Sequence, residues 1–91
     1  MLNIIRANRF VKDLRLAIKR GFKIELLDEV VTKLANQEKL PEKYHDHPLF
    51  GNYKDFRECH IQPDWLLIYS IDDKDLELYL FRTGMHSDLF D

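Results

Sequence analysis

Cysteine, glycine and proline are scarce in this chain. Its 91 residues include one cysteine, three glycines and three prolines. The lone Cys59 cannot form an internal disulfide, which is typical of proteins that work in a reducing cytoplasm, and we expect that location. With so few glycines, the chain lacks the Gly-rich loop of a P-loop or dinucleotide-binding site, so chemistry of those kinds is not expected.

Long apolar runs are also absent. No stretch approaches the ~20 apolar residues that are needed to cross a bilayer. The first residues, Met1 to Arg6, are too short and too soon charged to be a signal peptide. The 45% hydrophobic content is nevertheless sufficient for a folded domain. We therefore expect a single domain over residues 1–91, with a modest core and no membrane partner.

A strong net charge is lacking too, because 14 basic residues face 16 acidic ones for a net charge of −2. This balance hides an asymmetry, since residues 1–23 carry seven Lys and Arg against Asp13 alone. Lys12, Arg15 and Lys19 share one face of a predicted helix. Such a face is either simply solvated or binds phosphates, because counterion release depends on local charge.

The first half predicts one strand and two amphipathic helices. Residues 2–5 are apolar and partly β-branched, which favours a short strand. A helix is expected over residues 9–20, with Asn8 as its N-cap and Gly21 just after its end. Its apolar stripe at helical spacing is Phe10, Leu14 and Ile18. A second helix over residues 24–36 has its own stripe of Leu27, Val30, Val31 and Leu34.

The second half predicts a long ordered loop followed by three strands. Residues 37–52 are rich in turn formers, and the strand-like runs are residues 54–61, 65–71 and 76–81. Short links between these runs favour antiparallel neighbours, and the almost continuously apolar middle run predicts the central strand. The expected fold is therefore α+β, with an N-terminal strand, a helical hairpin, a three-strand antiparallel meander and a short C-terminal tail.

Three of the four histidines lie in short segments of the second half of the chain that are rich in polar and aromatic residues. Strand alternation places Glu58 and His60 on one face, about 7 Å apart. Asp64 follows in a turn, His47 lies in the loop before, and His86 comes just after the last strand. Imidazoles and carboxylates are the groups that acid–base chemistry needs near neutral pH.

Each of these residues also has a purely structural explanation. His47 before Pro48 and Asp64 after Pro63 can simply shape turns, and His45 is expected to be solvated. Glu58 and His60 can be exposed strand residues, and Arg82 at a strand end can pair with a carboxylate. Gly84 is expected for backbone freedom. Core packing alone would account for Cys59, Trp65 and Phe90.

Other classes of site are less well supported. Three histidines with Asp64 offer enough ligands for a zinc ion, but the helical His pair, Cys pair and His-Glu-x-x-His motifs of zinc sites are missing. Ser70 and Ser87 lack the context of a nucleophile elbow. We therefore expect neither a metal nor another cofactor.

Three ordered blocks, Tyr44–Gly51, Arg57–Tyr69 and Arg82–Phe90, closely resemble the YafQ branch of the RelE-like bacterial toxins. With the helical hairpin before them, the resemblance spans essentially the whole chain. It implies the RelE-like β-α-α-β-β-β fold and a ribosome-dependent mRNA endoribonuclease of a type II toxin–antitoxin system. It also implies a cognate antitoxin encoded beside the toxin, which is monomeric when free and hetero-oligomeric with the antitoxin.

The resemblance also implies roles for individual residues. Positions similar to the family's catalytic set are His47, Glu58, His60, Asp64, Arg82 and His86. Substrate binding falls to Phe90, Lys54 and Trp65, and the ribosome or RNA face is expected at Lys12, Arg15 and Lys19. The implied reaction is metal-independent attack by the substrate's own 2′-hydroxyl, with His86 as general acid, His60 and Asp64 on the base side, and Arg82 at the phosphate.

Two alternative functions are compatible with the same fold. One is a toxin of this superfamily without nuclease chemistry that acts by binding, as its gyrase-directed relatives do. The other is a plain interaction module whose histidines are incidental. The complete His and Asp set favours the nuclease, whereas the slightly acidic total charge departs from the basic character usual among toxins that act on the ribosome.

Overall fold

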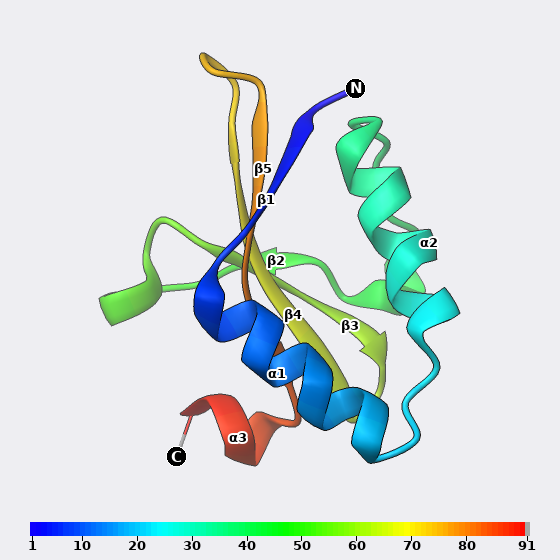
Figure 1. The fold of residues 1–91 in the computed structure, drawn as a ribbon. Helices are drawn as coiled ribbons and strands as arrows, with labels where there is room; N and C mark the ends of the chain where they lie inside the picture. Colours follow the sequence, from blue (N-terminus) through cyan, green and yellow to red (C-terminus); the bar gives the residue numbers. More distant parts are fainter. Residues whose placement is uncertain (91) are drawn as a thin grey trace.

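A computed structural model of the chain describes residues 1–90. The chain begins with β1 (Asn3–Arg6), α1 (Asn8–Lys19) and α2 (Ile24–Ala35). It ends with β3 (Arg57–Gln62), β4 (Trp65–Asp72), β5 (Glu77–Gly84) and the short helix α3 (His86–Phe90). The predicted α+β order of a strand, two helices and an antiparallel meander is thus confirmed (Figure 1).

The long loop is ordered, as predicted, and contains short elements of its own. These are the 3₁₀ turns η1 (Glu42–Tyr44) and η2 (Gly51–Tyr53), with the two-residue strand β2 (His47–Pro48) between them. β2 pairs with β3 and thereby extends the sheet, whose order is β1-β5-β4-β3-β2. β1 runs parallel to β5, and every other neighbouring pair is antiparallel.

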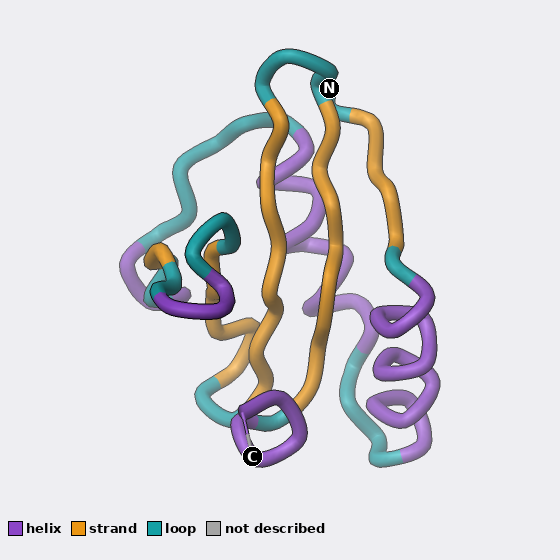
Figure 2. Tube along the Cα trace, turned by 90° about the vertical axis from the view of Figure 1, so that its left-hand side faces the viewer, coloured by secondary structure: helices purple, strands orange, loops and turns teal. Residues whose placement is uncertain are grey.

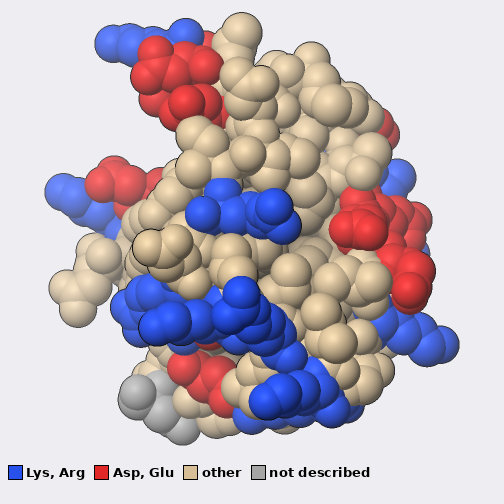
Figure 3. Space-filling model, in the orientation of Figure 1, with Lys and Arg blue, Asp and Glu red and all other residues tan. Residues whose placement is uncertain are grey.

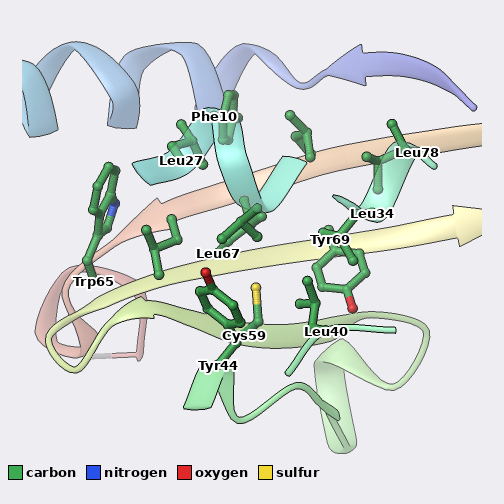
Figure 4. Close-up of a cluster of buried hydrophobic side chains, with 14 of the residues drawn as sticks. Phe10, Leu27, Leu34, Leu40, Tyr44, Cys59, Trp65, Leu67, Tyr69 and Leu78 are labelled. Atoms are coloured by element: carbon green, nitrogen blue, oxygen red, sulfur yellow. The ribbon is translucent and has the colours of Figure 1, made fainter. Parts of the chain in front are cut away.

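Two clusters of side chains hold the sheet, one on each of its faces. The larger lies under α1 and α2, and Figure 4 shows Phe10, Leu27, Leu67 and Tyr69 meeting in it. The smaller consists of Leu66, Ile68 and Leu89, with half-buried aromatic residues around it. Since β4 contributes to both clusters, the prediction that it is the central strand, buried on both faces, is confirmed.

The first helix departs from its predicted details. Asn8 is already helical, Ala7 occupies the cap position, and no side chain caps the end. Ile18 is 55% exposed, because Ala17 rather than Ile18 falls on the side of α1 that meets the sheet. Gly21 has a φ of 83°, the left-handed value that was expected at the helix end.

The C-terminal tail is helical, and α3 lies across the ends of the strands, as seen in Figure 2. Gly84 permits the sharp entry into α3, because its φ is 154° and a Cβ there would lie 3.2 Å from Asp88 Oδ2. Within residues 1–90, no helix has the length and apolar character needed to span a bilayer.

Candidate active site

The face of the sheet turned away from α1 and α2 carries a floor of aromatic side chains. The rings of Phe56 and Phe81 stack with their centroids 4.6 Å apart. Tyr53 contacts Phe81 and Phe90 at 6.3 and 5.6 Å. This apolar floor surrounds Leu66 and Ile68, so polar side chains at its margin are held in a surface of low polarity.

Glu58 lies at this margin with a histidine on either side. Its Oε1 is 3.4 Å from His47 Nε2 and 3.7 Å from His60 Nε2. The pairing of His47 with Glu58 across β2 and β3 brings the loop histidine to the strand carboxylate. Glu58 itself is only 6% exposed. The Glu58 carboxylate is therefore held between two imidazole rings, one from β2 and one from β3.

The other ring nitrogen of each histidine, Nδ1, lies near a backbone carbonyl oxygen. His47 Nδ1 lies 2.6 Å from the carbonyl oxygen of His45, and His60 Nδ1 lies 3.4 Å from that of Pro63. A carbonyl oxygen can only accept, so each Nδ1 donates its hydrogen, the longer contact of His60 being the weaker. Nε2 is therefore the nitrogen of each ring that can take or give a proton, and both Nε2 atoms face Glu58.

A brace on the helix-covered face holds the loop that carries His47. The Tyr69 hydroxyl donates to Asp46 Oδ1 at 2.5 Å, and Arg57 donates to both carboxylate oxygens of Asp46 at 3.3 Å. Burial first, and then the Asp46 contact, raises the pKa of the Tyr69 hydroxyl, so that it stays a donor. The brace fixes Asp46, and His47 is the next residue along the chain.

The sheet register places His86 on the opposite side of β4 from His60. His60 pairs with Leu66, which pairs in turn with Gly84, two residues before His86. Two strand spacings separate His60 and Gly84 by about 10 Å. Asp64 is exposed in the tight β3–β4 turn at this same end of the sheet. The His86 ring lies 5.0 Å from that of Phe90, which joins it to the aromatic floor.

An ion pair ties α3 to the end of α1. Arg20 Nη1 donates to Asp88 Oδ2 at 2.7 Å, and the same oxygen accepts from the Met85 amide at 2.9 Å. The Arg20 hydrogen bond lowers the pKa of the Asp88 carboxyl, which is therefore fully ionised near neutral pH. Asp88 thus caps α3 and positions the helix that carries His86.

Two residues of the predicted site, Arg82 and Trp65, are buried and make hydrogen bonds that hold the fold together. Arg82 is only 9% exposed and makes a two-point contact with Asp13, at 2.7 Å through Nε and 3.1 Å through Nη2. Trp65 is 1% exposed and donates to Thr83 Oγ1 at 2.8 Å. These placements favour the structural explanation of both residues, and neither is retained in the proposed site. Lys54 is exposed at the end of η2, and Phe90 is half-buried.

Cys59 is a buried residue of the core. Burial raises the pKa of the Cys59 thiol, which stays protonated inside the core, as the packing explanation expects. In the part of the chain described here, the one group of three or more His, Cys, Asp or Glu side chains close enough to hold a single ion is Asp72, Asp75 and Glu77, of which Glu77 is half-buried. This set lies at the β4–β5 hairpin and includes no histidine.

His45 is the residue that the sequence prediction undervalued. It is exposed, as expected, but its ring meets that of His60 edge-on with centroids 5.5 Å apart. Its φ of 47° turns the chain back, so that its carbonyl oxygen receives the Nδ1 hydrogen of His47. The His-x-His spacing was visible in the sequence, but the left-handed turn that brings both rings toward β3 was not.

Solved structures with this fold and with 39–50% sequence identity define the class of the protein, a small bacterial toxin. The chain superposes on a metal-bound toxin from Helicobacter pylori with a TM-score of 0.93 and 50% identity, covering 99% of this chain and 100% of that one. It superposes on the toxin of the DinJ–YafQ complex of Escherichia coli with a TM-score of 0.90, 39% identity and full coverage of both chains.

Sequence comparison then gives the family. The mRNA interferase toxin YafQ of E. coli strain K12 is 42% identical over 85 residues, which is 92% of this chain and 90% of that protein. The family model described as "Bacterial toxin of type II toxin-antitoxin system, YafQ" matches residues 2–91, and the chain belongs to this family. The resemblance noted in the sequence is therefore confirmed.

Proposed function

We propose that this toxin is a ribosome-dependent endoribonuclease that cuts translated mRNA. The observation that carries the proposal is the pair of Nε2 atoms, from His47 and His60, that flank the buried Glu58 while His86 lies across β4. An in-line displacement at phosphorus needs a base and an acid on opposite sides of the phosphate, and this arrangement supplies both. The similar protein from E. coli is itself named an mRNA interferase.

The reaction can be written with the groups at hand. His60 or His47, with Glu58 beside it and Asp64 in the β3–β4 turn, takes the proton of the 2′-hydroxyl through Nε2. The 2′-oxygen attacks phosphorus, the bond from phosphorus to the 5′-oxygen breaks, and His86 gives its proton to that oxygen. The products are a 2′,3′-cyclic phosphate and a 5′-hydroxyl, and no metal ion is needed. Because Arg82 is paired with Asp13, the phosphate charge falls to the imidazolium groups and the exposed Lys54.

Phe90 is well placed to orient the substrate beside the acid. Its ring is half-buried between Tyr53 and His86, with one contact at 5.6 Å and the other at 5.0 Å. A base stacked on this floor would hold its phosphate next to His86, since aromatic side chains bind bases of every kind through their faces.

A cognate antitoxin is part of the same proposal. The toxin of the E. coli complex was solved with DinJ, and this chain superposes on it over its full length. We infer that a comparable partner binds this toxin and silences it, so that the free toxin is a monomer and the stored form is a hetero-oligomer.

Expression of the chain with and without its antitoxin tests the function. Induced toxin alone should arrest growth, and primer extension on cellular mRNA should show cuts in register with the reading frame. Co-expressed antitoxin should remove both effects. Arrest without cuts would favour a toxin that acts only by binding. Soluble toxin without arrest would favour a plain interaction module.

The exposed basic face of α1 is the proposed contact with ribosomal RNA. Figure 3 shows Lys and Arg side chains gathered over the part of this view where α1 lies. Lys12, Arg15 and Lys19 are all exposed, and none of them has an ion-pair partner among residues 1–90. A band of unpaired cations is the feature that releases counterions on binding RNA.

Reversing Lys12, Arg15 and Lys19 to Glu should weaken ribosome binding at least tenfold at low salt, because three phosphate contacts become repulsive. The binding constant should also lose much of its salt dependence, which titrations at several ionic strengths will measure. Reversal of Lys33, Lys39 and Lys74, which lie outside α1, is the matched control. Equal binding by both triple variants would place the RNA face elsewhere.

A further inference from the structure

Beside the histidines, a groove runs between α2, η1 and the end of β3. Its volume is about 860 Å³. Leu26, Tyr44 and Ile61 give it apolar walls, while His45, His47 and His60 form the side that faces the proposed reaction centre. The proposed reaction uses only one edge of the histidine rings, so it leaves the groove itself without a bound part of the substrate. Glu29, Lys43 and Gln62 supply the other polar side chains of the lining.

We propose that this groove binds a nucleobase of the RNA substrate, an inference that rests on the proposed nuclease function. A base needs flat apolar surface for its faces and a few polar groups for its edge, and the groove offers both. Lys43, which also lines the groove, has its ammonium 5.1 Å from the centroid of the Tyr44 ring and is a cation at hand for the neighbouring phosphate.

The position of the groove identifies which nucleotide it receives. The base-side histidines, His47 and His60, both line the groove, whereas His86 follows β5 on the other side of β4 and is not part of the lining. The base side takes its proton from the 2′-hydroxyl of the nucleotide on the 5′ side of the cut. That nucleotide therefore lies nearest the groove, and the nucleotide on the 3′ side lies over the floor near Phe90.

Glu29 gives the groove a preference among bases. Its side chain is exposed on α2, and among residues 1–90 it has no ion-pair partner. A carboxylate only accepts hydrogen bonds, so it favours a base edge with adjacent N–H donors. Guanine presents two such donors on its Watson–Crick edge. Uracil presents one donor, which lies between two carbonyl oxygens, and these oxygens are repelled by a carboxylate. The groove should therefore favour guanine over uracil on the 5′ side of the cut.

Glu29→Gln tests this preference directly, with Glu25→Gln as the matched control. Both residues are exposed on α2, but only Glu29 lines the groove, so the two variants lose the same charge from the same helix. The measurement is the single-turnover cleavage rate of ribosome-bound mRNAs that differ only in the base on the 5′ side of the mapped cut. The ratio of the guanine rate to the uracil rate is the readout, because it is independent of any general change in affinity.

We expect the ratio to fall about tenfold in Glu29→Gln, the effect of one good side chain–base pair, and to stay at the wild-type value in Glu25→Gln. A ratio that is the same in all three proteins overturns the base-binding groove and leaves the nuclease function intact. An unchanged ratio with weaker antitoxin binding by Glu29→Gln would assign the groove to the antitoxin instead. Failure of the wild-type protein to cut any mRNA overturns the nuclease function and the groove assignment together.

Discussion

Replacing His86 with alanine should lower the rate of mRNA cleavage by 10²–10⁴-fold, the range that a positioned general acid contributes. An acid acts in its protonated form, so the wild-type rate should fall as the pH rises and that proton is lost. In His86→Ala this alkaline limb should disappear, while the acidic limb, which reports the base near Glu58, should remain. Single-turnover cleavage on stalled ribosomes across the pH range measures both effects.

Ser87→Ala is the matched control for this variant. Ser87 is the next residue of α3 and is exposed like His86, so the change leaves the helix and its Asp88 cap in place. It should keep the wild-type rate and both limbs of the profile. A His86→Ala protein with an unchanged pH profile would remove His86 from the proton transfer, whatever the size of its rate loss.

Replacing Asp13 with alanine should lower the free energy of unfolding by about 3 kcal/mol, because it leaves a largely buried guanidinium without its partner. The Asp13 carboxylate accepts from both Nε and Nη2 of Arg82, and it also accepts from the Thr83 amide at 3.2 Å. The side chains of Arg82 and Asp13 are 11% and 15% exposed, so water can replace these contacts only in part. Urea unfolding measures the loss.

Asp28→Ala is the control for Asp13→Ala, since Asp28 is exposed on α2 and has no ion pair among residues 1–90. That variant should unfold within about 0.5 kcal/mol of the wild type. The comparison also bears on the role of Arg82. If Asp13→Ala unfolds like Asp28→Ala, then Arg82 does not depend on Asp13 in the fold, and the phosphate-binding role implied by the family resemblance would regain support.

The interactions around Asp13 and Asp88 also connect the two proposed RNA surfaces. Asp13 and Arg20 both belong to the α1 segment, the first inside the helix and the second just after its end. One pairs with Arg82 on β5 and the other with Asp88 on α3, so both reach the segment that leads to His86. The α1 segment, which carries the basic face, is thus held by one charged contact to β5 and by another to α3, the helix that carries the proposed acid.

The sequence by itself determined the order of elements and the local part of the site. Period-two alternation put Glu58 and His60 on one face, and the apolar run of residues 65–71 identified the central strand, since both patterns depend only on backbone geometry. The three sequence blocks were also enough to identify the family. Each block is a continuous motif within a single loop, hairpin or strand end, so it can be identified without knowing what packs around it.

Tertiary structure alone decided which charged and aromatic groups are free to act. Arg82 finds its partner 69 residues away on α1, and Trp65 turns into the core to meet Thr83 and Phe22. The left-handed turn at His45 brings a histidine that alternation could not place beside His60. Local periodicity says which side of an element a residue occupies, but the partner that satisfies a buried charge comes from a remote element. Only the packing of helices on the sheet fixes that choice.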